Sequence, residues 1–142
     1  YEKTVADAKK RKLTNVIFYP DLTEVDSYET LASADVFIGF LQKHPTVDRI
    51  VPNKVYQGFA LGKTVVTGET PVMNELFEHK KHVYFCKLAD GKSLANAVLE
   101  LRSNEKLQTD IAKDGYKIFM DKFTPRQIGK QFINLMIKSQ AN

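Results

Sequence analysis

The feature that most constrains the fold is a predicted helix that leads directly into an apolar strand. The helix runs from Pro52 to about Leu61, because proline suits the first turn of a helix and Gly62 suits the left-handed position just past its end. The strand follows over residues 64–67. Proline and glycine therefore bracket the helix and fix where the strand begins.

The first turn of this helix is a predicted anion site. It carries Asn53 and Lys54, so that free backbone N–H groups, the positive end of the helix dipole and an ammonium group converge on one spot. Such a spot is a seat for a phosphate group. The same residues also fit an ordinary solvated helix end, and the pattern alone leaves both interpretations open.

Composition limits the size and the partners of the protein. The chain has 142 residues, of which 43% are hydrophobic, enough for one core, and a single domain is expected. The net charge is +4, but lysines are interspersed with acidic residues along the chain. This distribution fits the anionic groups of a small ligand better than nucleic acid, so no nucleic-acid partner is expected.

Several features indicate a cytoplasmic protein. The single cysteine, Cys86, cannot form an internal disulfide and is compatible with a reducing compartment. The longest apolar runs have the length of strands, and no signal peptide opens the chain. The first residue is not Met and already belongs to a predicted helix, so we expect a piece of a larger protein.

The order of the predicted elements favours an α/β fold. Predicted strands alternate with helices up to Cys86, and helices dominate afterwards. The run over residues 35–41 is almost wholly apolar, as in a parallel strand covered on both faces. We therefore expect a parallel sheet with right-handed crossovers between layers of helices. The other predicted strands cover residues 15–19 and 83–86, and the other predicted helices residues 1–12, 24–34, 71–79, 93–102, 105–121 and 125–139.

This architecture also predicts where a ligand binds. Open α/β sheets bind ligands beyond the carboxyl ends of their strands, here in the loops of residues 20–23, 42–52 and 68–71. No GxGxxG, GxxxxGK[ST] or GxSxG motif occurs. His79, His82 and Cys86 have a spacing seen among metal ligands, but they are better explained as an exposed turn and a buried strand thiol. No metal site is therefore expected, and no pattern identifies a catalytic residue.

The segment of residues 48–68, DRIVPNKVYQGFALGKTVVTG, resembles a known family. It is similar to the C-terminal, nucleotide-sugar-binding domain of GT-B glycosyltransferases of the family 4 type, also called glycosyl transferases group 1. The likeness extends outward to residues 15–20 (NVIFYP), 34–36 (ADV), 71–77 (PVMNELF) and 123–125 (FTP). It implies a Rossmann-like parallel sheet flanked by helices, which is one half of a GT-B fold.

The resemblance assigns roles to individual residues. It implies that Lys54, with Asn53 and the backbone of the first turn, faces the diphosphate of the donor. Gln57 stands where the family usually has a Glu that holds the ribose hydroxyls; an amide can still bond to them, without the added strength of a charge. The family's other Glu, which contacts the donor sugar, falls on Arg49, with Asp48 beside it. The resemblance also places Tyr19 and Asp21 in the loop that meets the base.

The resemblance also implies what the complete enzyme does. Residues 1–142 are expected to be one donor domain that lacks its first strands and the N-terminal acceptor domain, so that the fragment alone is inactive. The implied activity is hexosyl transfer with retention of configuration, from a nucleotide-diphosphate sugar such as a UDP- or GDP-sugar and without a cofactor. It belongs to polysaccharide or glycoconjugate biosynthesis, and peripheral association of the full enzyme with a membrane stays open.

Two alternatives remain beside this assignment. One is a GT-B epimerase of nucleotide sugars, which would use similar phosphate contacts with acid and base residues from the absent half. The other is a non-catalytic α/β binding module whose central helix packs on a protein partner.

Overall fold

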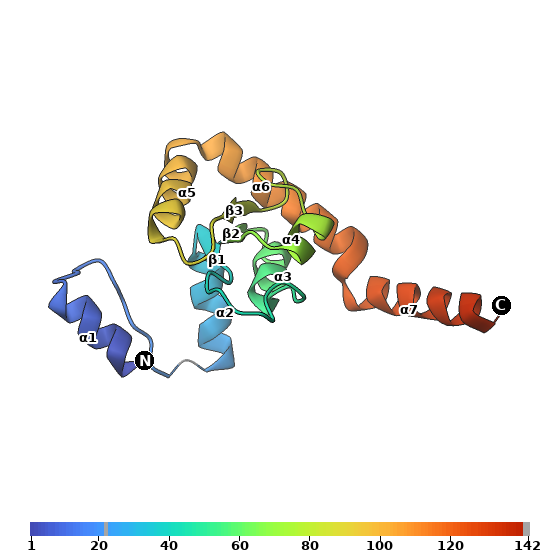
Figure 1. Ribbon diagram of the computed structural model, residues 1–142, viewed down its shortest axis with the longest axis horizontal. Helices are drawn as coiled ribbons and strands as arrows, with labels where there is room; N and C mark the ends of the chain where they lie inside the picture. Colours follow the sequence, from blue (N-terminus) through green and yellow to red (C-terminus); the bar gives the residue numbers. More distant parts are fainter. Residues whose placement is uncertain (22, 141–142) are drawn as a thin grey trace. The chain divides into compact units, whose positions relative to one another are not determined.

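The computed structural model describes residues 1–21 and 23–140, and its elements are shown in Figure 1. The chain divides into two compact units, Tyr1–Ser33 and Ala34–Asn142, and each is described by itself. The expectation of a single donor domain stays a prediction.

The first unit contains two helices. Helix α1 covers Glu2–Lys10 and carries Lys9 and Lys10 in its last turn, where cations favour the helix dipole. Helix α2 covers Glu24–Ser33. Both helices were expected from the sequence, within a few residues at their ends.

The prediction of a strand over residues 15–19 is wrong. These residues form no strand, and the side chain of Ile17 is 75% exposed. The Phe18 ring of this segment meets the Tyr1 ring edge-on, with 6.1 Å between their centroids. A strand needs a neighbouring strand for its backbone hydrogen bonds, and the described residues of this unit provide none. The β-favouring composition of the segment is therefore not sufficient.

The second unit is built on a parallel sheet, which confirms the predicted fold class. Its strands are β1 (Val36–Ile38), β2 (Thr64–Gly68) and β3 (Tyr84–Cys86), in the order β1-β2-β3. Val36 pairs with Thr64, and Val66 pairs with Tyr84. All five residues of β2 are buried, as expected for the central strand of a sheet covered on both faces.

The helices of this unit follow the order predicted from the sequence. Four of them begin with a side chain that caps the first turn: Thr70 for α4, Asp90 for α5, Asn104 for α6 and Thr124 for α7. The predicted helix over residues 105–121 is α-helical only to Ile118, after which the chain widens into a short π-helix, η1. The bounds are α3 Asn53–Ala60, α4 Pro71–Leu76, α5 Gly91–Ser103, α6 Glu105–Ile118, η1 Phe119–Phe123 and α7 Pro125–Gln140.

Helices cover both faces of the sheet, and Figure 1 shows them around the strands. On one face, Val66 belongs to a buried cluster with Ala97 and Leu101 of α5 and Ile111 of α6. Val65 points to the opposite face, because neighbouring residues of a strand alternate. There it meets Gly58 of α3. The predicted layering of helices about the sheet is thus confirmed.

Gly58 sets how closely α3 approaches the sheet. A Cβ atom at this position would lie 2.5 Å from Cγ2 of Val65 and 3.2 Å from the Phe37 ring, too close for an ordinary contact. The absence of a side chain therefore fixes the position of α3, and with it the position of the helix start.

We predict that Gly58→Ala lowers the free energy of unfolding by about 1–3 kcal/mol, because the added methyl group forces α3 away from a packed core. The measurement is the urea midpoint at equal denaturant slope. Gly129→Ala in α7 is the matched control, since no atom lies within 4 Å of its added Cβ. If both variants change stability equally, close packing at Gly58 is not the reason.

Candidate functional site

The loop after β1 lies directly over the carboxyl end of β2. The N–H of Gly39 donates to the carbonyl of Val66 at 2.8 Å, and the N–H of Gly68 donates to the carbonyl of Phe40 at 2.8 Å. The backbone N–H of Phe40 also donates to the hydroxyl of Thr67 at 3.2 Å. The N–H of Ala89, from the loop after β3, reaches the carbonyl of Leu41 at 2.7 Å. These bonds connect the segments at the carboxyl ends of all three strands to one another.

The loop then rises into a short turn that carries two of the predicted residues. Val47 is buried and anchors the turn, and its N–H donates to the carbonyl of His44 at 3.0 Å. The N–H of Arg49 donates to the carbonyl of Thr46 at 3.1 Å. Asp48 and Arg49 are both exposed next to the anchor. Their side chains are therefore open to a ligand.

The start of α3 is open in a way that the starts of α4, α5 and α6 are not. Pro52 is the residue before the helix, in an extended conformation, and not in its first turn as predicted. It has no side chain that could accept a hydrogen bond, and no side chain caps this helix start. The first-turn N–H groups of Asn53 and Lys54 therefore have no partner within the helix.

Three side chains of α3 line this open end. Asn53, Lys54 and Gln57 are all exposed, and Gln57 lies one turn after Asn53 and Lys54 on the same side of the helix. Lys54 takes part in none of the ion pairs found among the described residues. Its ammonium group is available to an anion.

Two cavities follow the carboxyl edge of the sheet. One, of about 510 Å³, is lined by Lys43, Glu69, Thr70, Asn74 and Lys87 among others. The other, of about 400 Å³, is lined by Lys43, His44 and Asp48. Both are also lined by Leu88, so they adjoin. Their residues come from the loops that follow β1, β2 and β3, which is where an α/β sheet binds ligands.

The helix start belongs to the same edge. A narrow crevice of about 10 Å³ is lined by Pro52 of the α3 start, by Gly68 at the end of β2 and by Thr70, which also lines the larger of the two cavities. The open end of α3 therefore faces the carboxyl ends of the strands and not their starts.

A third and more voluminous cavity, of about 830 Å³, lies at the opposite end of the strands. It is lined by Val36 and Thr64, where β1 and β2 begin, together with the anions Asp35 and Glu105 and the cations Lys63 and Arg102. A position at the amino ends of the strands does not fit the rule for ligand binding in this fold. We therefore place the candidate site at the carboxyl edge.

Of the seven predicted site residues, Asp48 lines a cavity at the carboxyl edge, and the role of all seven stays a prediction. Asp48, Arg49, Asn53, Lys54 and Gln57 lie along the loop and the helix that border the carboxyl edge. Tyr19 and Asp21 belong to the first unit, and their role stays a prediction.

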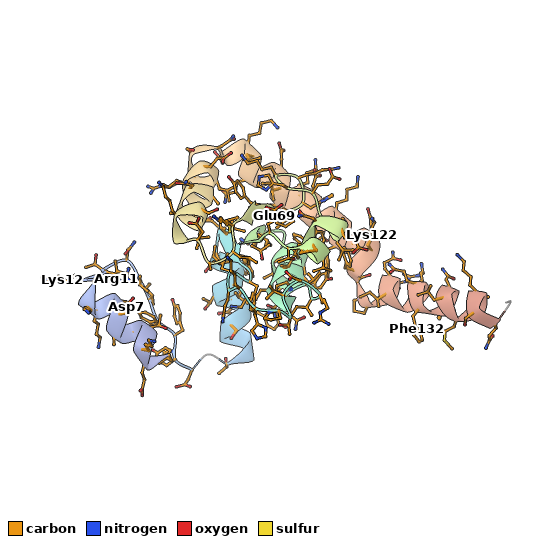
Figure 2. All side chains as sticks on the ribbon, viewed as in Figure 1. Asp7, Arg11, Lys12, Glu69, Lys122 and Phe132 are labelled. Atoms are coloured by element: carbon orange, nitrogen blue, oxygen red, sulfur yellow. The ribbon has the colours of Figure 1, made fainter. Side chains whose placement is uncertain are left out.

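Sequence reasoning missed three charged residues at this edge: Lys43, Glu69 and Lys87. Glu69, labelled in Figure 2, directly follows β2, and its carboxylate accepts a hydrogen bond from the amide of Asn74 at 3.1 Å. Lys43 and Lys87 line the same cavity as Glu69 from the loops after β1 and β3. The sequence signal that could have identified these three residues is their position shortly after predicted strands.

The residues of the metal alternative are engaged in other contacts. The backbone N–H of Phe85 donates to Nδ1 of His79 at 3.0 Å, and that of Glu78 donates to Nδ1 of His82 at 3.1 Å. The Cys86 thiol is buried and donates to the carbonyl of Thr67 at 3.4 Å. Burial, followed by the nearby charge of Asp90, raises the pKa of this thiol, which keeps it protonated. Among the described residues, no three His, Cys, Asp or Glu side chains are grouped as metal ligands.

Within residues 1–21 and 23–140, no helix is both long enough and apolar enough to cross a membrane.

The fold defines the class of the protein: a Rossmann-like α/β domain, with its candidate site beyond the carboxyl ends of the parallel strands. The family model described as glycosyl transferase-like matches residues 6–134, and the chain therefore belongs to that family. No curated protein sequence is matched by the chain.

Solved structures share the fold, which is that of a GT-B Rossmann-like domain. HepE from Anabaena, in complex with UDP, is 17% identical with a TM-score of 0.81, over 96% of this chain and 36% of HepE. Sucrose-phosphate synthase from Thermosynechococcus elongatus is 14% identical with a TM-score of 0.78, over 99% of this chain and 34% of the synthase. The C-terminal domain of LpcC, a glycosyl transferase group 1 protein from Francisella tularensis, is 16% identical with a TM-score of 0.64, over 87% and 62%. The chain thus spans about a third of HepE and of the synthase.

We predict that the domain loses stability as the pH falls through the titration range of histidine. Burial is the main cause that lowers the pKa of both His79 and His82, so the unfolded chain binds more protons in that range than the folded one. The contribution of the two histidines to the free energy of unfolding is then fully present above about pH 6.5 and decreases below it. Urea unfolding at several values between about pH 8 and pH 5 measures the slope. A stability that rises toward pH 5 would contradict the assignment of neutral, hydrogen-bonded imidazoles.

Proposed function

We propose that this chain is the donor-binding part of a glycosyltransferase and that it binds a nucleotide-diphosphate sugar. One observation carries the proposal: the uncapped start of α3, with the exposed Lys54, opens at the carboxyl edge of the sheet. Membership of the glycosyl transferase-like family supports the substrate class. So do the structures of HepE, a protein with the same fold, in complex with UDP and with UDP-glucose.

The diphosphate is assigned to the start of α3. The N–H groups of Asn53 and Lys54 and the positive end of the helix dipole stabilise anionic oxygens. The ammonium group of Lys54 adds a full charge to these partial ones. As the bond to the sugar breaks, negative charge grows on the departing nucleotide, and these groups stabilise it. The proposal assigns this task to the chain itself, without a metal or another cofactor.

The remaining predicted residues are assigned to the other parts of the donor. Gln57, one turn along α3, is placed to bond with the ribose hydroxyls. Asp48 and Arg49, on the exposed turn before the helix, are assigned to the sugar. Tyr19 and Asp21 are assigned to the base.

The complete enzyme is proposed to transfer a hexose, with retention of configuration, to an acceptor held by an N-terminal domain. The isolated chain is then a binding domain without activity. A cytoplasmic location is proposed for this enzyme, where the buried thiol of Cys86 remains reduced. No observation favours the epimerase or the non-catalytic binding module.

We predict that Lys54→Ala lowers the affinity for UDP about tenfold or more, since a charge-assisted bond to the diphosphate is lost. Isothermal titration calorimetry with UDP, GDP and ADP measures the effect and identifies the base. Lys106→Ala is the matched control, because Lys106 is also in the first turn of a helix, α6, which begins beside the amino ends of the strands. Its ion pair with Asp110 is exposed and adds little stability.

The outcomes of this titration separate the alternatives. Equal loss of UDP affinity in the Lys54 and Lys106 variants would mean that Lys54 does not contact the diphosphate. Unchanged UDP affinity in the presence of a chelator is expected, because the chain supplies the positive charge. Saturating UDP, GDP and ADP without any binding signal would count against donor binding and favour the binding module.

We predict a second, independent effect at Gln57. Gln57→Ala lowers the affinity for UDP about threefold to tenfold, through loss of neutral hydrogen bonds to the ribose. The affinity for the dideoxyribose analogue of UDP stays the same, since that ligand lacks the hydroxyls. Gln57→Glu offers two acceptor oxygens to the ribose hydroxyls and retains binding of UDP. A similar loss for both ligands in the Ala variant would mean that Gln57 does not contact the ribose.

A further inference from the structure

The cavity of about 510 Å³ at the carboxyl edge is lined by two cations that have no ion-pair partner. Lys43 and Lys87 line it from the loops after β1 and β3, and both residues are exposed. Neither lysine takes part in an ion pair among residues 1–21 and 23–140. The volume lies within the range of about 300–1,000 Å³ that is usual for small-ligand sites. The positive charge of both lysines is therefore available to a ligand of that size.

A carboxylate, that of Glu69, lines the same cavity and is engaged by an amide. Its Oε1 accepts a hydrogen bond from the side-chain amide of Asn74 at 3.1 Å. An ionised carboxylate accepts several hydrogen bonds, so positions remain for the hydroxyl groups of a ligand. The lining thus offers positive charge for an anion and an acceptor for hydroxyl groups.

Hydrogen bonds between and within the loops hold the backbone beside both lysines. The N–H of Ala89 donates to the carbonyl of Leu41 at 2.7 Å, and each of these residues lies two positions from one of the lysines. The N–H of Lys87 donates to the hydroxyl of Ser93 at 3.0 Å. Ala89 has a φ of +56°, a left-handed conformation that persists in a residue with a Cβ only where its surroundings enforce it. The loops therefore present Lys43 and Lys87 from a fixed backbone.

The cavity continues from the place assigned to the diphosphate. Thr70 lines both this cavity and the crevice at Pro52, the residue before α3. Lys43 also lines the adjoining cavity together with Asp48, which the proposed function assigns to the sugar. A donor whose diphosphate lies at the start of α3 can therefore extend its sugar toward Lys43 and Lys87.

The charges of the lining favour an acidic sugar over a neutral one. A neutral hexose carries only hydroxyl groups and would leave both ammonium groups without an anion. A hexuronic acid has a carboxylate that can bond to both lysines, and hydroxyl groups that can donate to Glu69. The diphosphate is already assigned to α3, so the carboxylate is the remaining anionic group of such a donor.

We propose that the sugar of the donor is a hexuronic acid and that Lys43 and Lys87 bind its carboxylate. This specificity rests on the proposed function, since it concerns the sugar of the same nucleotide-diphosphate donor. Glu69 accepts a hydrogen bond from a hydroxyl group of the ring and so orients it. The two lysines select the sugar and have no assigned part in the transfer step.

Isothermal titration calorimetry of the chain with UDP, UDP-glucose and UDP-glucuronate tests this proposal. The two sugar nucleotides differ only at C6 of the sugar, where UDP-glucuronate has a carboxylate in place of a hydroxymethyl group. UDP-glucuronate binds about tenfold more tightly than UDP-glucose, because its carboxylate forms charge-assisted bonds. Added salt reduces this preference, since both lysines are exposed.

Variants of the two lysines test whether they cause the preference. Lys43→Met and Lys87→Met each keep an unbranched apolar side chain and lower the preference about threefold, and the double variant abolishes it. Lys87→Glu reverses the preference in favour of UDP-glucose, because it places a like charge at the carboxylate. The matched control is Lys92→Met, since Lys92 is an exposed residue in the first turn of α5 and lines neither cavity. It keeps the preference.

The outcomes distinguish this proposal from the function on which it rests. If UDP binds but UDP-glucuronate binds no more tightly than UDP-glucose, the sugar is not selected by its charge and the donor-binding function stands. An equal loss of preference in the Lys87 and Lys92 variants would also overturn the proposal, because the net charge and not the cavity would then be responsible. Absence of binding by all three ligands would overturn the donor-binding function and this proposal with it.

Discussion

The contact between the Thr67 hydroxyl and the backbone of Phe40 determines the geometry of the candidate site. Thr67 is buried in β2, and its hydroxyl accepts the N–H of Phe40 at 3.2 Å and lies 3.3 Å from the Phe40 carbonyl. This closeness requires Gly39, since a Cβ there would be 2.5 Å from the Thr67 hydroxyl oxygen. The loop after β1 is thereby held against the end of β2. Everything that follows in the chain up to α3 starts from this fixed point.

Helix α3 is stabilised at its sheet-facing side and at its end, which leaves its start open for a ligand. Gly58 allows the close approach to Val65, and Gly62 ends the helix with a φ of +64°. The N–H of Lys63 then closes the last turn on the carbonyl of Gly58 at 2.9 Å. Because these contacts hold the helix, no side chain is needed to cap its first turn. Stability and anion binding are thus served by opposite ends of one short helix.

Local signals in the sequence were sufficient for the main architecture. The apolar runs at Val36, Val65 and Tyr84 became parallel strands, and the capping residues Thr70 and Asn104 marked the starts of helices. The segment of residues 15–19 shows the limit, since β propensity acts only where a partner strand exists. Lys43, Glu69 and Lys87 show another limit. They meet only because three strands end at one edge, and loop residues carry no periodic pattern that reveals such a meeting. The assignments of Tyr19 and Asp21 rest on the family resemblance alone.

The proline before α3 has a consequence for hydrogen exchange. The starts of α4, α5 and α6 have amide hydrogens already engaged by Thr70, Asp90 and Asn104. At α3 no side chain engages a first-turn amide, and that of Val55 donates to the Pro52 carbonyl at 2.9 Å, so the amides of Asn53 and Lys54 are expected to exchange with deuterium faster than the capped ones. The helix thus carries, in its own backbone, two isotopic reporters whose exchange is slowed by an incoming acceptor.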